Sequence, residues 1–201
     1  MDARLIAWGR RVKRISGPPP LWLFTDAARM PDLLALVLAL PPRLCGVVFR
    51  HDSSPARAAL GARLAALCRA RRIALVVAGD ARLAARLRAG VHLRGGRRAG
   101  MLAPPRRALI SASAHDGAEL RRARKAGADI IFISPVFPTA SHPGATGLGS
   151  LGFLNLARQA GGARAFALGG INGRSIRRLG KFCHGAGAIG ALLSRDETHG
   201  R

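Results

Sequence analysis

The stretch GADIIFISPVFPTASHPGATGLG, residues 127–149, decides the fold. Residues 130–133 form an apolar run without polar alternation, which is typical of a strand buried on both faces in a parallel sheet. Prolines, glycines and small polar residues follow directly, and ligands of α/β folds bind just past the carboxyl ends of strands. Thr139, Ser141 and His142 carry groups that can hold phosphate oxygens. The stretch therefore predicts a buried strand and an anion-binding loop, with an ordinary strand-to-helix connection as the alternative.

The same alternation of short apolar segments and helical segments runs along the whole chain. Strands are predicted over residues 21–26, 44–52, 73–80, 90–94, 109–116, 129–134, 163–173 and 185–189. Helices are predicted between them over residues 31–40, 53–71, 81–88, 117–125 and 151–159, whereas residues 95–107 contain too much Gly, Arg and Pro for a full helix. Eight such units predict a parallel sheet with right-handed crossovers that closes as a barrel.

The length of 201 residues suits a single domain. We expect an α/β protein of the (β/α)8 TIM-barrel class with an N-terminal helical extension. The predicted divisions are a helix and linker over residues 1–19, the barrel over 20–195 and a tail over 196–201. Residues 1–16 have the pattern of an amphipathic helix packed against the domain.

Charge is the most unusual feature of the composition. Lys and Arg number 33 against 10 Asp and Glu, which gives a formal net charge of +23. Such a charge favours anionic partners and raises the possibility of nucleic acid. The arginines are, however, spread through almost every segment, Tyr is absent, and no aromatic-basic cluster occurs. We therefore predict small phosphorylated molecules as partners, and neither nucleic acid nor membrane.

Localisation is inferred from cysteines and hydropathy. Cys45, Cys68 and Cys183 are far apart and have no metal-ligand spacing, which favours reduced thiols in a cytoplasmic protein. The longest apolar run, residues 33–40, is far shorter than the roughly 20 residues that cross a bilayer. The N-terminal residues lack the apolar region of a secretory signal.

The loops after the last two predicted strands are rich in glycine. Gly169, Gly170 and Gly190 allow backbone N–H groups to approach an anion, and phosphate commonly binds to these two loops in barrels. With Ile189 and the hydroxyl-bearing loop that contains Thr139, they predict a phosphate-binding cup.

The other strand ends carry a mixed set of cations, hydroxyls and scattered carboxylates. They are Arg50, His51, Asp52, Asp80, Arg94, Ser113 and His115. This set suits a phosphorylated or pyrophosphorylated small molecule better than a two-metal centre, which needs clustered carboxylates. His92 lies among apolar residues, so we expect a buried structural histidine there.

These motifs together resemble the thiamine-phosphate synthase/TenI family of (β/α)8 proteins. The resemblance is carried by GADIIFISPVFPTASHPG, by FALGGIN at residues 166–172 and by the Gly/Ala-rich last strand. LWLFTD, GVVFRHD and GVHL are weaker landmarks in the same order, so the resemblance covers about residues 20 to 195.

The resemblance implies a transferase of thiamine biosynthesis. Synthases of the family join an aminopyrimidine pyrophosphate to a thiazole phosphate, with Mg²⁺ assisting the departure of pyrophosphate. By position, Arg50 and Ser113 would serve catalysis and Asp80 would bind the metal. The phosphate-binding residues implied in this way are Thr139, Ser141, Gly169, Gly170, Ile189 and Gly190; His142 stands in place of a lysine of the family and is a further phosphate-binding candidate.

The chain also departs from the family pattern. Val48 stands where Gln is expected and Asp52 where Lys is expected, while Gly79-Asp80 replaces an Asn-Asp pair. The second aspartate expected to bind Mg²⁺ is absent, and Arg97 lies near its position. The TenI branch has a catalytic His where this chain has Pro135. Alternatives are therefore a TenI-like or non-catalytic protein that binds a phosphorylated small molecule, and, from another class, a basic protein that binds nucleic acid.

Overall fold

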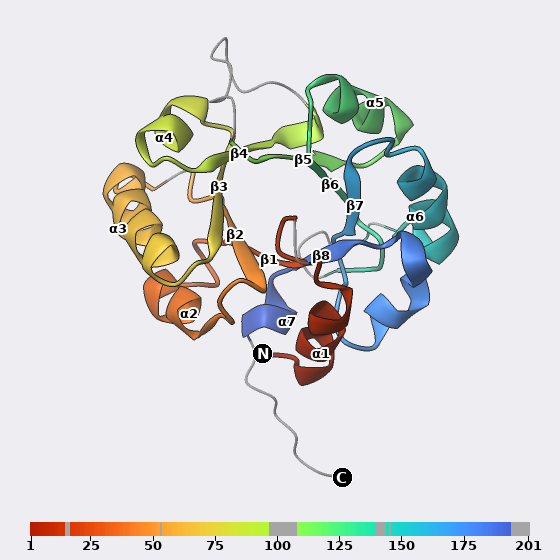
Figure 1. Ribbon diagram of the computed structural model, residues 1–201, viewed down its shortest axis with the longest axis horizontal. Helices are drawn as coiled ribbons and strands as arrows, with labels where there is room; N and C mark the ends of the chain where they lie inside the picture. Colours follow the sequence, from red (N-terminus) through yellow and green to blue (C-terminus); the bar gives the residue numbers. More distant parts are fainter. Residues whose placement is uncertain (15–16, 53, 97–107, 140–143, 145, 194–201) are drawn as a thin grey trace.

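Eight parallel strands close into a barrel in the computed structural model (Figure 1), which describes residues 1–14, 17–52, 54–96, 108–139, 144 and 146–193. Each strand pairs with the next along the chain, and β1 pairs with β8 to complete the ring. The strands are β1 (Leu21–Phe24), β2 (Cys45–Phe49), β3 (Ala74–Ala78), β4 (Gly90–Leu93), β5 (Ile110–Ala114), β6 (Ile130–Ile133), β7 (Arg164–Ala167) and β8 (Gly185–Ala188). The predicted fold is confirmed.

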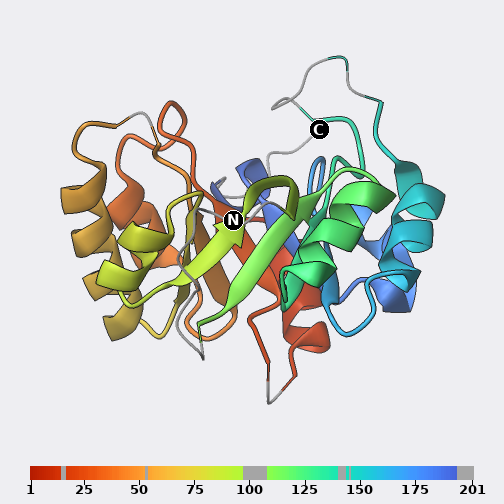
Figure 2. The same cartoon turned by 90° about the horizontal axis from the view of Figure 1, so that it is seen from above.

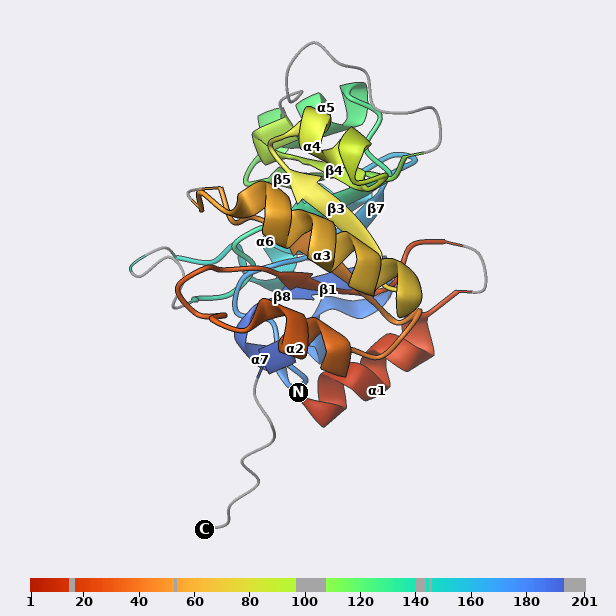
Figure 3. The ribbon, with the colours of Figure 1, turned by 90° about the vertical axis from the view of Figure 1, so that its left-hand side faces the viewer.

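Helices cover the outer surface of the barrel, as the side view in Figure 2 shows. They are α1 (Ala3–Val12), α2 (Leu33–Ala39), α3 (Arg57–Ala70), α4 (Ala81–Arg86), α5 (Gly117–Lys125), α6 (Gly149–Arg158) and α7 (Gly190–Leu193), with 3₁₀ segments η1 (Arg94–Gly96) and η2 (Ser175–Phe182). In Figure 3, α2, α3 and α4 lie one beside the next along one side of the barrel. Aspartates begin four of these helices: Asp2, Asp32, Asp80 and Asp116 each accept an N–H of the first turn.

The N-terminal helix packs beside the described part of the last helix. α7 has 4 described residues. α1 lies beside α7 (Figure 1) and buries Leu5, Ile6 and Trp8 in the main core, as its amphipathic pattern predicts. Asp2 fixes this helix twice, because its Oδ1 accepts the N–H of Leu5 at 3.0 Å and its Oδ2 accepts the N–H of Gly173 at 2.6 Å.

Aromatic rings fill the inside of the barrel. Phe132 makes edge contacts with Trp22, Phe24 and Phe166 at centroid distances of 6.1, 4.8 and 5.5 Å. Glycine on a neighbouring strand makes room for them: a Cβ on Gly185 would lie 2.2 Å from the ring of Phe166. The Gly/Ala-rich last strand is therefore explained by the size of the rings that it faces.

At their carboxyl ends, the strands stop earlier than the sequence predicted. The predicted strand 44–52 ends at Phe49, and the predicted strand 163–173 ends at Ala167. The residues after these points turn toward the mouth of the barrel and leave the ladder. The 3₁₀ segment η2 was not predicted, because residues 175–182 combine Gly with Arg and Lys and show no long helical period. The segment 95–107, which was predicted to lack a full helix, lies mostly outside the described residues.

The described helices include none that is long and apolar enough to cross a membrane.

Cys45, Cys68 and Cys183 are free and buried, and burial raises the pKa of each thiol to about 12.

Candidate functional site

A cavity of about 650 Å³ opens at the carboxyl ends of the strands. Residues after β1, β2, β4 and β5 line most of it, and Ser134 and Leu168 extend it to the ends of β6 and β7. Arg50, His51, Asp52, Arg94, Ser113 and His115, which the sequence pointed to, all line this one cavity. Asp80 is not among the residues that line it.

Thr25 organises the cationic side of the cavity. Its buried Oγ1 accepts the backbone N–H of Arg50 at 2.9 Å and lies 3.0 Å from His51 Nδ1. The Nε of Arg50 donates to the carbonyl of Thr25 at 3.0 Å, and its guanidinium lies 5.4 Å from the ring centroid of Phe24. Arg50 is therefore held in one orientation from three sides. The sequence identified Arg50 but gave Thr25 no role.

Burial changes the electrostatics of this group. It lowers the pKa of Arg50 below its ordinary value, an effect that Asp26 opposes and Arg94 reinforces. The guanidinium nevertheless stays charged, because an arginine does not lose its proton in proteins. Burial also lowers the pKa of His51, which favours a neutral ring.

Arg57 links Asp52, which lines the cavity, to Asp80, which does not. Its Nη2 lies 2.9 Å from Asp52 Oδ1 and 2.7 Å from the carbonyl of Ala78, and its Nη1 lies 3.4 Å from Asp80 Oδ2. Arg94 pairs with the other oxygen of Asp52. Asp80 Oδ1 accepts the N–H of Leu83 at 2.8 Å and so begins α4. The sequence gave Arg57 no role, since an arginine in an Arg-rich helix carries no distinguishing signal.

The far side of the cavity holds serines and a histidine. Ser113 Oγ accepts the N–H of Gly95 at 3.0 Å, which ties β5 to the segment after β4. His115 Nδ1 lies 2.7 Å from the carbonyl of Ser134, and its backbone N–H donates to Glu119 at 2.8 Å. Glu119 and Ser134 were not identified from the sequence.

His92 is buried inside the barrel, as its apolar neighbours predicted. Its Nδ1 lies 3.0 Å from Ser111 Oγ, and the ring contacts Phe24 edge-on. Burial lowers its pKa to about 3, and the nearby Arg50 and Arg94 act in the same direction. His92 is therefore neutral over the physiological range.

The loops after β6 and β7 form one unit. The N–H of Phe137 donates to the carbonyl of Gly169 at 3.1 Å. Gly170 has φ +64°, and a Cβ there would lie 2.6 Å from the carbonyl oxygen of Pro138. Gly169 has φ +88°, and a Cβ there would lie 2.8 Å from Pro135 Cα, so Gly169 and Gly170 both allow the close approach of these two loops.

The remaining cup residues are described only in part. Thr139 is half-buried beyond Pro138, Ile189 is half-buried, and Gly190 is exposed at the start of α7. Ser141 and His142 lie outside the described residues, as does Arg97. β6, β7 and β8 are neighbours in the barrel, so the described cup residues follow three adjacent strands.

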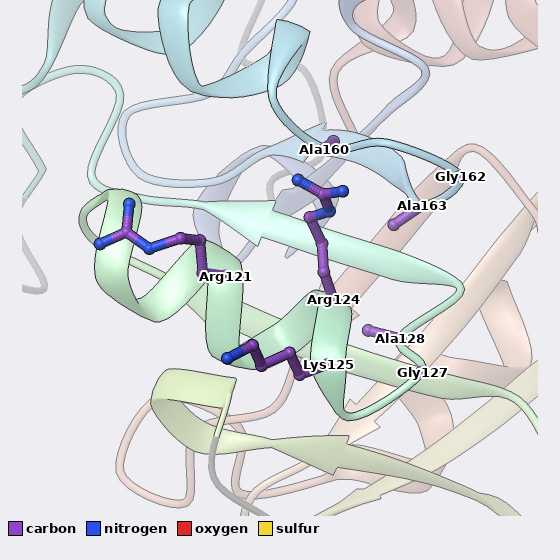
Figure 4. Close-up of a pocket in the computed structure, with 8 residues that line it drawn as sticks. All are labelled: Arg121, Arg124, Lys125, Gly127, Ala128, Ala160, Gly162 and Ala163. Carbon is purple, nitrogen blue, oxygen red and sulfur yellow. The ribbon is translucent and has the colours of Figure 1, made fainter.

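A second cavity of about 550 Å³ lies at the opposite end of the barrel, between the ends of α5 and α6 (Figure 4). Arg121, Arg124 and Lys125 line it, and Arg124 Nη1 donates to the carbonyl of Gln159 at 3.0 Å. Cations in the last turn of a helix complement its dipole, which accounts for this charge without a ligand.

Comparison with known proteins shows to which family this chain is related. The family described as "Thiamine monophosphate synthase" (TMP-TENI) matches residues 26–191. The "Thiamine biosynthesis bifunctional protein ThiM/ThiE" of Symbiobacterium thermophilum is 31% identical over 196 residues, 94% of this chain. The match spans 40% of that relative's length. For both curated relatives, the matched part is about two fifths of the relative's own length.

Solved structures agree on the fold. A thiamine phosphate pyrophosphorylase from Pyrococcus furiosus superimposes with a TM-score of 0.71 at 24% identity, over 88% of both chains. A 2-keto-3-deoxy-6-phosphogluconate aldolase of Zymomonas mobilis, solved with 3-phosphoglycerate, gives 0.54 at 14% identity over 92% of this chain and 85% of its own. At these identities the structures show a shared barrel alone. The family match, which spans most of the sequence, shows that this chain belongs to the thiamine-phosphate synthase/TenI family.

Proposed function

We propose that this protein is a thiamine-phosphate synthase-like transferase that joins an aminopyrimidine pyrophosphate to a thiazole phosphate. One observation carries the proposal. A single cavity extends from Arg50 and Ser113 to Leu168, the residue before Gly169 of the predicted phosphate cup. A pyrophosphate bound near Arg50 and a phosphate bound at the cup would face each other across the mouth of one barrel.

The proposed reaction needs positive charge more than proton transfer. The bond between the pyrimidine methylene carbon and the pyrophosphate oxygen breaks, and its electron pair leaves with pyrophosphate. The thiazole nitrogen then donates its lone pair to the carbon, so that one C–O bond is exchanged for one C–N bond. Arg50, oriented by Thr25, would stabilise the charge that develops on the leaving oxygens. Ser113 would add a hydroxyl contact from β5.

The cup would hold the second substrate. Thr139, with Ser141 and His142, would supply side-chain donors to the thiazole phosphate. The backbone at Gly169, Gly170, Ile189 and Gly190 would supply N–H groups from the two following loops. The resemblance in these residues supports this assignment, and the described positions follow adjacent strands.

Mg²⁺ is the cofactor that the family implies, but the described carboxylates do not fit it well. Both oxygens of Asp80 and both oxygens of Asp52 already contact N–H groups or arginines. Among the residues that the structure describes, no three His, Cys, Asp or Glu side chains group closely enough to hold a metal ion.

A non-catalytic phosphate-binding protein is the second candidate. The observation that favours it is the loss of polar groups on β2: Val48, at the position of an expected Gln, is buried among the aromatic rings of the barrel interior. Such a protein would bind both phosphorylated heterocycles and release no pyrophosphate.

The deciding experiment is an assay of thiamine phosphate formation. Purified protein is incubated with the two substrates, with and without Mg²⁺, and the products are separated by chromatography. Formation of thiamine phosphate that Arg50→Gln abolishes supports the transferase. Binding of the substrates by calorimetry without product supports the second candidate, and no binding of either substrate contradicts both.

A further inference from the structure

Arg57 occupies the space between two carboxylates of the pyrophosphate side of the site. One guanidinium contacts Asp52 Oδ1 at 2.9 Å and Asp80 Oδ2 at 3.4 Å, on opposite nitrogens. The third acceptor is the carbonyl of Ala78, at 2.7 Å, and the guanidinium carbon lies 5.9 Å from the ring centroid of Phe49. The Arg57 side chain is only 17% exposed, so these contacts fix it within the wall of the barrel.

The carboxylates that line the cavity are likewise paired with arginines. Asp26 Oδ2 lies 3.9 Å from Arg29, and Glu119 Oε1 lies 3.4 Å from Arg122. Asp52 has a second partner in Arg94 on its other oxygen. Within the described residues, Arg29, Arg50, Arg57, Arg94 and Arg122 thus give five positive charges against the four negative charges of Asp26, Asp52, Asp80 and Glu119. These nine described groups together carry a formal charge of +1 before any metal binds.

A divalent cation would compete for the same oxygens. Mg²⁺ requires near-octahedral oxygen ligands at about 2.0–2.1 Å and is usually held by one or two carboxylates together with substrate phosphates. An ion between Asp52 and Asp80 would have to displace a largely buried guanidinium from both. Arginine, in contrast, needs no loading and stays charged at every physiological pH.

We propose that Arg57 stands in place of a divalent cation in this chain, so that pyrophosphate is held by fixed arginines with no metal between Asp52 and Asp80. The inference rests on the proposed function for the identity of the ligand. Arg57 acts here as a positioning residue: it neutralises Asp52 and Asp80, while Arg50 and Arg94 line the cavity and face the ligand. Arg94, whose side chain is 55% exposed, can exchange Asp52 for a pyrophosphate oxygen.

The first test asks whether Arg57 keeps metal out, and it needs no organic ligand. Mn²⁺ is titrated into the full chain, and free Mn²⁺ is followed by electron paramagnetic resonance. We expect no binding to the wild type or to Arg57→Lys, which keeps one positive charge, and at least about tenfold tighter binding to Arg57→Ala. Asp80→Asn in the Arg57→Ala background should abolish the gained site.

Two outcomes of the Mn²⁺ titration overturn the inference. One is binding to the wild type that Asp80→Asn removes. The other is an Arg57→Ala variant that keeps its circular dichroism spectrum and melts cooperatively but gains no Mn²⁺ site, because Arg57 is then not what excludes the ion.

The second test uses inorganic pyrophosphate as the probe in isothermal titration calorimetry. We expect dissociation constants in EDTA and in Mg²⁺ that agree within about threefold, and about tenfold weaker binding by Arg94→Gln in EDTA. Binding that appears only with Mg²⁺ overturns the inference. Absence of pyrophosphate binding under both conditions instead removes support from the proposed function, and the Mn²⁺ titration then decides the role of Arg57 by itself.

Discussion

At the scale of single residues, the site depends on side chains that hold other side chains. Thr25 is uncharged and buried, yet it contacts the backbone of Arg50 and the ring of His51. Arg57 in turn holds Asp52 and Asp80. Such positioning residues are invisible in the sequence, because a threonine at the end of a strand and an arginine in a helix are ordinary. Arg50, Ser113 and His115 were found because they lie at the carboxyl ends of apolar strands, where polar residues are conspicuous.

Arg50 should matter for the transition state. Replacing it by Met removes the guanidinium that Thr25 orients toward the cavity, and a lost charge-assisted contact corresponds to roughly 2–3 kcal/mol. We expect kcat/KM for the aminopyrimidine pyrophosphate to fall about 100-fold, as measured by thiamine phosphate formation. Arg82→Met removes the same charge from an exposed position on α4 and should change kcat/KM less than twofold. Equal losses in the two variants would mean that only net charge matters.

His92 should make stability depend on pH. Its folded-state pKa is lowered from 6.5 to about 3 by burial, so between these values the unfolded chain binds one more proton than the folded chain. Stability is therefore full above pH 6.5 and is lost as the pH falls, by about 1.4 kcal/mol per pH unit from this group.

Urea denaturation at pH 7.5, 6.0 and 5.0 measures this effect. His92→Gln keeps a group able to bond Ser111 but does not titrate, so its stability should decline less steeply between pH 6.0 and 5.0 than that of the wild type. His51, whose pKa burial also lowers, accounts for part of the remaining slope. Parallel pH dependences in the two proteins would refute the assignment to His92.

At the scale of elements, periodicity and apolar runs predicted the order of strands and helices, while the lengths were less accessible. The predicted strand 44–52 was too long because Arg50, His51 and Asp52 follow Phe49 without a proline or glycine. They leave the ladder because Thr25 and Arg57 hold them in the cavity wall, a tertiary effect that no local pattern contains. The position of α1 beside α7 is likewise a tertiary feature that could not be read from α1 alone.

The linked loops after β6 and β7 give a prediction at this scale. In Gly170→Val, a branched side chain would occupy a left-handed backbone position with φ +64° and meet Pro138 and Phe137. We expect a loss of about 1–3 kcal/mol in stability and a loss of at least about tenfold in affinity for thiazole phosphate, as the loops separate. Calorimetric titration and thermal melts measure the two effects.

The matched control is Gly162→Ala. Gly162 is exposed, and a Cβ there would meet nothing within 4 Å. This variant should retain both stability and affinity. If Gly170→Val also retains its affinity for thiazole phosphate, the phosphate cup lies elsewhere.

At the scale of the whole molecule, the barrel separates packing from binding. Its interior is closed by aromatic rings, with Phe132 touching Trp22, Phe24 and Phe166. The polar groups that follow the strands gather above these rings in one cavity. The arginines therefore fall into two groups: those paired with the few carboxylates at the site, and the many others outside it, which account for most of the net charge of +23.

This division predicts how salt affects binding. A small ligand held by Arg50 and Arg94 engages few charges, so its affinity should depend weakly on salt. A protein that neutralises 6–10 phosphates of a nucleic acid instead loses about 10³–10⁵ in affinity between 50 and 200 mM salt. We expect the dissociation constant for pyrophosphate to rise less than about tenfold over that range. A 20-nucleotide RNA, added in excess at about 150 mM salt, should leave pyrophosphate binding unchanged, because the sequence has no Tyr and no cluster of aromatic and basic residues on which bases could stack. Calorimetric competition at the two salt concentrations measures both effects. Displacement of pyrophosphate by RNA at 150 mM salt would show that the cavity is part of a polyanion surface, and the protein would then be a nucleic-acid-binding member of its family.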